Sequence, residues 1–284
     1  MDSLDPIKTK SLPRYSEGQV ISKDGTTIGY RQTGSGPGVV ILHGGARASQ
    51  HYLLLAKALA EWFTVYLPDR RGRGLSGPVG ADYSIRKESE DLGAILQATG
   101  ARRAFGHSAG GFIALETAIE LPIEKLAVYE PPVSIHASID FSFLPRLEQA
   151  LADQDGAAAF VIFLKGLRLN WMTRLPSWLL VPMARQMLRD ADGQEMIRLI
   201  PTAIWEAREV QRLDSTEARY ATIRADTLLL SGSRSPAYLR ASLPLLERII
   251  PHARWVETRG FDHQAPDQKA PVQIAARLKE FFLE

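Results

Sequence analysis

Residues 106–110 read Gly-His-Ser-Ala-Gly, a spacing that presents a serine for nucleophilic attack. A predicted strand precedes this segment and a predicted helix follows it, so Ser108 would lie in a sharp turn between the two. The flanking glycines let the backbone bend without Cβ clashes, and the first N–H groups of the helix would lie beside the reacting atom. We therefore predict that Ser108 is a nucleophile. A glycine-rich turn with an incidental serine is the alternative.

A serine hydroxyl needs a base to remove its proton, and histidine is the usual base near neutral pH. His263 ends the sequence Gly-Phe-Asp-His, a few residues after a predicted strand over 253–257. A loop at that point would lie at the same edge of a parallel sheet as Ser108. The other five histidines lie in turns, on a helix, in a helical segment or before a strand, and they are less well placed. His263 is thus the predicted base, and a solvated loop histidine is the alternative.

Residues 43–46 read His-Gly-Gly-Ala and directly follow a predicted strand. A carbonyl under attack becomes an oxyanion that needs fixed donors, and the backbone N–H groups of Gly45 and Ala109 are the natural pair. Loss of one such donor typically costs ~10²–10³ in rate. We also expect Gly44 and His107, from the same two turns, to line the substrate pocket. A plain turn between a strand and a helix is the alternative for residues 43–46.

Short apolar runs alternate with amphipathic segments along most of the chain, which predicts a parallel sheet with helices on both faces. Residues 18–22 and 26–33 flank Lys-Asp-Gly and predict a hairpin before the first of these units. The further predicted strands are 38–44, 63–69, 101–105, 126–130, 227–230 and 253–257. The predicted helices are 49–60, 84–98, 109–120 and 271–282.

One segment, 131–215, has no convincing strand and holds three of the five tryptophans and four of the five methionines. Pro145, Pro176, Pro182 and Pro201 predict a division into short helices. A helical insertion this rich in aromatic and soft side chains predicts a cap over a cavity, with Trp171 and Trp178 among the pocket residues. A second helical layer with its own core is the alternative. We therefore divide the chain into a core of residues 1–130 and 216–284 and a cap of residues 131–215.

The composition excludes several functions. The chain has 284 residues, 45% hydrophobic residues, a net charge of +2 and no cysteine. These values are typical of a globular protein and argue against a polybasic nucleic-acid binder, disulfides, thiolate metal sites and a cysteine nucleophile. No long apolar run and no apolar signal core is present, so we expect a cytoplasmic protein with no membrane partner. No spacing indicates a metal site. Monomer and homodimer both stay open.

The order of HGG, GHSAG and GFDH along the chain resembles the α/β-hydrolase superfamily. Residues 68–76, Pro-Asp-Arg-Arg-Gly-Arg-Gly-Leu-Ser, are similar to that family's loop after its fourth strand. The resemblance covers nearly the whole chain. It implies an α/β fold with an eight-stranded, mostly parallel sheet flanked by helices and a helical cap inserted after the sixth strand. It also implies Ser108 as nucleophile, His263 as base, and Gly45 with Ala109 as oxyanion hole.

The acid of the triad departs from the commonest pattern of the family. Most members carry an aspartate in the loop after the seventh strand, where this chain has Ser235 and no carboxylate nearby. A minority place the acid after the sixth strand, and Glu130 stands there. Since adjacent parallel strands end at the same edge, Glu130 could reach the far ring nitrogen of His263. The alternative is a strand-end glutamate that pairs with an arginine.

Two patterns of arginine and glycine within residues 70–77 receive other interpretations. Gly72, Gly74 and Gly77 match a dinucleotide fingerprint, but proline and glycine follow where a helix should begin, so we interpret them as a loop. Arg70, Arg71 and Arg73 are expected to be solvated, with binding of an acidic substrate group as the alternative.

These observations predict a cofactor-independent serine hydrolase of the carboxylic ester hydrolase or lactonase type. Its partner would be a small to medium, partly apolar ester or lactone, cleaved through an acyl-enzyme. A carbon–carbon bond hydrolase, a hydroxynitrile lyase, a cofactor-free peroxidase and a slow-turnover ligand receptor use similar residues, and the fold does not choose among them. Opening of epoxides or haloalkanes by an aspartate nucleophile is disfavoured because Ser108 occupies the turn.

Overall fold

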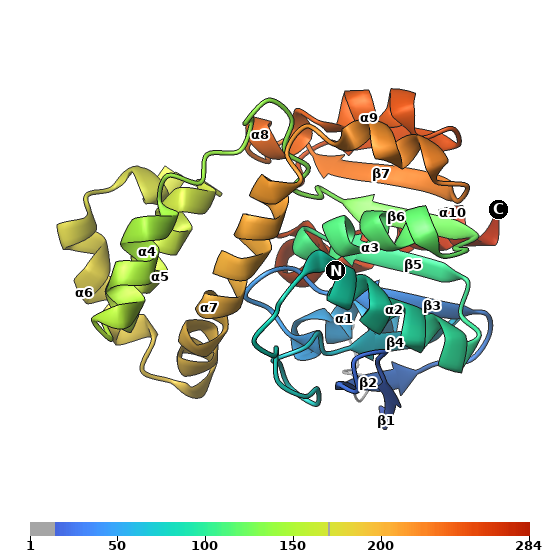
Figure 1. The fold of residues 1–284 in the computed structure, drawn as a ribbon, viewed down its shortest axis with the longest axis horizontal. Helices are drawn as coiled ribbons and strands as arrows, with labels where there is room; N and C mark the ends of the chain where they lie inside the picture. The colour runs from blue at the N-terminus through green and yellow to red at the C-terminus, as the bar shows by residue number, and fades with distance from the viewer. Residues whose placement is uncertain (1–14, 170) are drawn as a thin grey trace, which may run out of the picture.

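Eight strands form one twisted sheet at the centre of the molecule (Figure 1). The computed structural model describes residues 15–169 and 171–284. The sheet order is β1-β2-β4-β3-β5-β6-β7-β8; β3 to β8 run parallel, and β1 and β2 add an antiparallel edge. This confirms the expected α/β-hydrolase fold. The strands are β1 Ser16–Ile21, β2 Thr27–Thr33, β3 Gly38–Leu42, β4 Thr64–Pro68, β5 Arg103–His107, β6 Lys125–Tyr129, β7 Asp226–Gly232 and β8 Ala253–Thr258.

The inner strands are apolar on both faces because helices cover both sides of the sheet. Alternate residues of β3 show this: Val39 and Ile41 pack into one core, whereas Val40 and Leu42 pack into the other. The first core contains residues of α1 (Leu53–Leu59) and α10 (Pro271–Leu283). The second contains residues of α2 (Ile85–Thr99), α3 (Ala109–Glu120) and α9 (Leu243–Ile249). A further short helix, α8, spans Ala237–Arg240.

Residues 131–215, called the insertion below, form a helical lobe beside the sheet. They contain α4 (Leu144–Ala152), α5 (Gly156–Leu167), α6 (Ser177–Met187) and α7 (Ala191–Arg212), and no strand is found among their described residues. Figure 1 shows α4, α5 and α6 grouped at the side of the molecule, with α7 running between them and the core. The lobe has an apolar core of its own, which includes Leu147, Phe160 and Ile200. The division into two domains stays a prediction.

The prolines of the insertion do not all break helices as the sequence predicts. Pro176 precedes α6, but Pro182 lies inside that helix and Pro201 lies inside the 22-residue α7. Tertiary packing of these helices therefore outweighs the local cost of a proline, which is about 3 kcal/mol in a helix interior.

The two ends of the insertion are tied to each other where it leaves and rejoins the core. Ser134 donates its hydroxyl to Asp214, and the Ser215 N–H donates to the Ser134 carbonyl at 3.1 Å. The His136 N–H donates to the Ser215 hydroxyl at 2.8 Å. We call residues 134–137 and 214–215 the neck.

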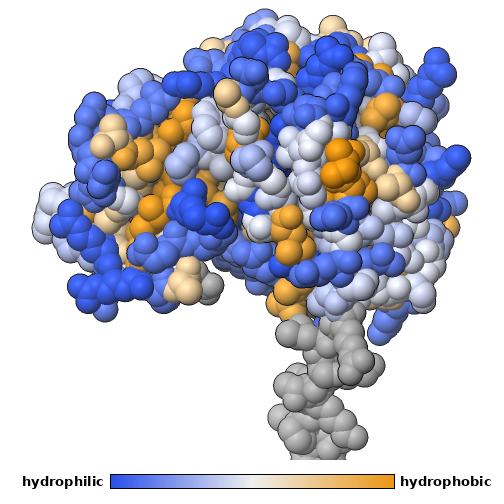
Figure 2. Space-filling view, turned by 60° about the horizontal axis from the view of Figure 1, so that its bottom comes forward, coloured by the Kyte–Doolittle hydropathy of each residue, from blue (hydrophilic) through white to orange (hydrophobic). Residues whose placement is uncertain are grey.

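Hydrophobic side chains gather on the outside of the insertion, at the left of Figure 2. Trp178 is 77% exposed, and Met183 is about half exposed. No helix within residues 15–169 and 171–284 is both long enough and apolar enough to cross a membrane.

Candidate active site

Ser108 occupies a strained turn between β5 and α3. Its φ is 53° and its ψ is −122°, a conformation that residues other than glycine rarely adopt. The two neighbouring glycines make the turn possible: a Cβ on Gly106 would lie 2.3 Å from the Gly110 carbonyl oxygen, and one on Gly110 would lie 2.5 Å from the Leu42 oxygen. Because the turn packs this tightly, Ser108 is held at the carboxyl edge of the sheet and lines the adjoining cavity.

His263 and Glu130 meet at the same edge. Nδ1 of His263 lies 2.7 Å from Oε2 of Glu130, which directly follows β6 and is completely buried. The other carboxylate oxygen accepts the Gly232 N–H at 2.7 Å. When Nδ1 donates to the carboxylate, the second ring nitrogen of His263 is free to accept a proton. The structure thus brings Glu130 to His263, and among the described residues no arginine pairs with Glu130.

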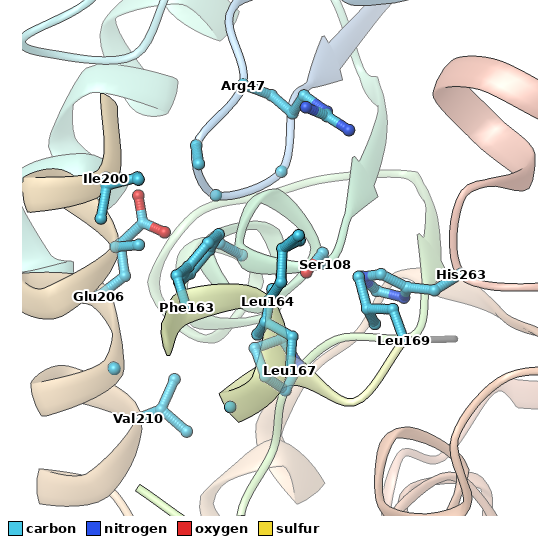
Figure 3. A pocket seen from close by; sticks show the side chains of 18 of the residues that line it. Arg47, Ser108, Phe163, Leu164, Leu167, Leu169, Ile200, Glu206, Val210 and His263 are labelled. Atoms are coloured by element: carbon cyan, nitrogen blue, oxygen red, sulfur yellow. The ribbon is translucent and has the colours of Figure 1, made fainter. Parts of the chain in front are cut away.

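The loop after β7, where most of the family carries the acid, has Ser235 at that position. Asp262 is next to His263 in the chain, but its carboxylate pairs with Lys269 and accepts the Gln264 N–H, and among the described residues no hydrogen bond joins it to the imidazole. Ser108 and His263 line the same cavity, and Figure 3 shows both side chains facing it.

The backbone of residues 43–46, the oxyanion loop, lies against Ser108. A Cβ built on Gly44 would be 3.4 Å from the Ser108 Cβ, and one on Gly45 would be 3.8 Å from the Ala109 Cβ. Within residues 15–169 and 171–284, neither the Gly45 N–H nor the Ala109 N–H donates a hydrogen bond. The expected pair of donors is therefore adjacent to the serine and free to bind a ligand oxygen.

A buried chain of hydrogen bonds connects the three loops that carry these groups. The Gly44 N–H donates to the Tyr52 hydroxyl at 3.0 Å, and that hydroxyl lies 2.5 Å from Nδ1 of His107. Nε2 of His107 lies 2.8 Å from the His263 carbonyl oxygen. Burial lowers the pKa of His107 well below its usual range, and the nearby His263 adds to this, so the ring is neutral.

The neutral ring has a defined arrangement. A carbonyl oxygen only accepts, so Nε2 of His107 donates to it and Nδ1 accepts from Tyr52. Tyr52 was not predicted as a site residue, because an aromatic residue beside an apolar run indicates core packing before it indicates a site. His107 and Gly44 both line the cavity, as expected.

The cavity has a volume of about 510 Å³, which is typical of a small-molecule pocket. It lies between the sheet edge and the insertion, and its walls are mainly apolar. Trp178 does not line it, contrary to expectation, because α6 lies on the outer side of the lobe and exposes this residue. The side chain of Trp171 lies outside the described residues. Apolar lining residues from the insertion include Phe141, Phe160, Phe163, Leu164, Leu167, Met196, Ile200 and Val210.

The expectation of solvated arginines after β4 is wrong. Arg70, Arg71 and Arg73 are 2%, 0% and 2% exposed. Arg71 forms an ion pair with Asp91 at 2.7 Å, and Arg70 pairs with Glu88 at 2.6 Å. Burial is possible because carboxylates from distant parts of the chain neutralise each guanidinium. Within residues 15–169 and 171–284, no group of three or more histidine, aspartate or glutamate side chains is arranged to hold a metal ion.

Comparison with known proteins shows which sequences and structures are similar to this chain. The crystal structure of an alpha/beta hydrolase from Sphaerobacter thermophilus is similar, with a TM-score of 0.78, 33% identity, and coverage of 93% of this chain and 100% of that one. An uncharacterized protein of Mycobacterium bovis is 34% identical over 122 residues, which are 42% of this chain and 35% of that protein. The uncharacterized hydrolase YraK of Bacillus subtilis is 32% identical over 113 residues, which are 38% of this chain and 42% of that protein.

The chain thus matches less than half the length of each of these curated relatives. The family model described as "Alpha/beta hydrolase family" matches residues 39–277, which is most of the sequence. Because the family model matches most of the sequence and the fold agrees with that of a solved relative, the chain belongs to the alpha/beta hydrolase family.

Proposed function

We propose that this chain is a serine hydrolase that cleaves a carboxylic ester or lactone through an acyl-enzyme. The observation that carries the proposal is the 2.7 Å contact between His263 and the buried Glu130 carboxylate, at the cavity that Ser108 also lines. A hydroxyl, an imidazole and a buried carboxylate in this order supply a nucleophile, a base and a group that stabilises the charged base.

The reaction begins when Ser108 Oγ attacks the carbonyl carbon and Nε2 of His263 takes its proton. The carbonyl oxygen becomes an oxyanion and accepts hydrogen bonds from the backbone N–H groups of Gly45 and Ala109. His263 then gives its proton to the leaving alkoxide. A water molecule, deprotonated by His263, attacks the acyl carbon. The bond from that carbon to Ser108 Oγ then breaks, His263 returns the proton to Oγ, and the acid is released. Glu130 stays ionised and stabilises the imidazolium in both halves.

The walls of the cavity support a partly apolar substrate. Aromatic and aliphatic side chains of the insertion face the sheet edge, and burial of apolar substrate surface against them is favourable by about 25 cal/mol per Å². In this proposal the insertion is a cap that encloses the substrate, and residues outside 131–215 form the catalytic core.

The test is covalent labelling combined with turnover. A fluorophosphonate probe should add one adduct to Ser108, seen by peptide mass spectrometry, and the protein should hydrolyse short p-nitrophenyl esters. Ser108→Ala should abolish both, whereas Ser235→Ala, which removes a hydroxyl from the loop after β7, should keep both. Labelling at a different residue, or full turnover by Ser108→Ala, would exclude the proposed mechanism.

A further inference from the structure

A buried ion cluster joins the insertion to the core beside the oxyanion loop. Glu206, on α7, accepts Nη2 of Arg70 at 2.8 Å and Nη2 of Arg73, both on the same oxygen, Oε1. Arg70 also donates to both oxygens of Glu88, on α2. Two arginines thus face two glutamates, and the cluster carries no net charge.

The second oxygen of Glu206, Oε2, has no such partner. Within residues 15–169 and 171–284 it accepts no hydrogen bond, although Glu206 is only 8% exposed and lines the cavity. It lies close to the oxyanion loop, since a Cβ built on Gly45 would be 2.6 Å from Oε2. In the same cluster Arg70 Nη1 is buried without a partner, whereas Oε2 is accessible from the cavity. An unmatched acceptor therefore lies next to a donor expected to bind the oxyanion.

The unpaired Oε2 is unfavourable for the proposed reaction unless a substrate group binds it. Oε2 can accept a hydrogen bond from a donor in the cavity, and without one the carboxylate next to the proposed oxyanion hole opposes the negative charge that develops there. A donor on the substrate would give Oε2 a partner and would weaken the negative potential that the carboxylate presents to the oxyanion. A cation is a poorer match, because Arg70 and Arg73 flank the carboxylate and would repel it.

The position of Glu206 indicates which part of the substrate would contact it. His263 protonates the leaving group, so the alcohol part of an ester lies on the His263 side of Ser108. Figure 3 shows Glu206 on the side of Ser108 opposite His263, the same side as Phe163 and Val210, which also line the cavity. The acyl part of the substrate would therefore approach Glu206.

We propose, on the basis of the proposed ester hydrolysis, that Glu206 determines specificity for an acyl group that bears a neutral hydrogen-bond donor near its carbonyl. The donor is a hydroxyl or an amide N–H, and it binds Oε2 of Glu206. The apolar remainder of the acyl group packs against Phe163 and Val210. The preferred substrates are thus esters of hydroxy acids or of N-acylated amino acids, not of plain fatty acids.

The experiment compares matched esters with one alcohol: ethyl butyrate, ethyl 3-hydroxybutyrate and ethyl N-acetylglycinate. The wild-type protein should show a kcat/KM at least tenfold higher for one of the two donor-bearing esters, because a hydrogen bond to a charged group is worth about that factor or more. The hydroxyl and amide arms identify which donor fits.

Two variants separate specificity from structural damage. In Glu206→Gln the amide oxygen will face the donors of Arg70 and Arg73. The NH₂ group will then face the cavity, so a donor replaces the acceptor Oε2. The preference should then disappear, whatever happens to the overall rate. Thr202→Val removes another partner of Arg73, a 2.7 Å hydrogen bond in the same cluster, and keeps Oε2. It should lower the rates on all three esters alike and keep the preference.

Equal or better turnover of ethyl butyrate by the wild-type protein would overturn this inference, as would an unchanged preference in Glu206→Gln. Either result leaves the ester hydrolysis itself standing. Absence of turnover on every ester, together with no phosphonate adduct on Ser108, would instead overturn the proposed function and this inference with it.

Discussion

Replacement of Glu130 by glutamine tests the part of the site that departs from the commonest family pattern. The wild-type carboxylate accepts two hydrogen bonds, from His263 Nδ1 and from the Gly232 N–H, each at 2.7 Å. A glutamine amide has nearly the same shape but only one acceptor atom. It can therefore keep only one of these two interactions.

The two orientations of the amide have different costs. With its NH₂ group toward the Gly232 N–H, two donors face each other in a fully buried site, which costs about 1–3 kcal/mol for the unmatched N–H. With its oxygen toward Gly232, the NH₂ group donates to His263 Nδ1, and every group is satisfied. The second orientation is the favoured one.

The favoured orientation removes the base. When Nδ1 of His263 accepts a hydrogen bond, the ring proton must lie on Nε2, which then has no lone pair for the serine proton. The corresponding change in a related serine–histidine–acid triad lowers kcat by ~10⁴, equivalent to about 5 kcal/mol in the barrier. We expect a similar loss for Glu130→Gln, with only a small change in the free energy of unfolding.

The assay is steady-state hydrolysis of a p-nitrophenyl ester, with urea unfolding of the same samples. Ser235→Ala is the matched control, since it alters the loop where the acid would otherwise lie and should keep kcat within a factor of about three. A kcat for Glu130→Gln within tenfold of the wild-type value would refute the assignment of Glu130 as the acid. A large loss of stability would show that its role is structural.

Two further predictions follow from the buried hydrogen bonds. Tyr52→Phe leaves the Gly44 N–H without its acceptor, so unfolding should cost about 1–3 kcal/mol less and kcat should fall more than KM changes; an unaltered kcat would mean that the oxyanion loop does not depend on this bond. Burial lowers the pKa of His43 well below its usual range, so the unfolded chain binds a proton near pH 6.5 that the folded chain does not. Stability should therefore fall as the pH drops below about 6.5, by up to about 1.4 kcal/mol per pH unit from this residue, and urea titrations of His43→Asn should lack that part of the slope. Identical slopes for both proteins would contradict the reasoning.

The fold was predictable because its signals are local and mutually consistent. Apolar runs that alternate with amphipathic segments define the parallel sheet, and the family and the eight-stranded architecture are confirmed. Glu130 could be assigned a place near His263 because neighbouring parallel strands end at one edge. The catalytic roles of Ser108, His263 and Glu130 stay predictions, since they concern chemistry and not position.

The errors concern contacts between residues far apart in the sequence. Three arginines in a glycine-rich loop indicate solvent exposure unless their partners are known, and the partner Glu206 lies 136 positions from Arg70. The direction of a side chain on an insertion helix is equally hidden: the aromatic-rich segment predicts Trp178 in the pocket, whereas the structure exposes it to solvent. Local sequence patterns specify helices and strands, but they do not specify which distant helix or strand each one contacts.

The neck has a consequence for exchange of modules between relatives. Because Ser134 and Ser215 are bonded to each other, the two chain crossings of the insertion form a single joint. A chimera cut outside that joint, at Pro131, would disturb the backbone next to Glu130, whose φ of 48° is already strained. Cutting on its far side would transplant a new lobe and leave the carboxylate where it is. Exchange of lobes at the neck would thus leave the contact between Glu130 and His263 intact.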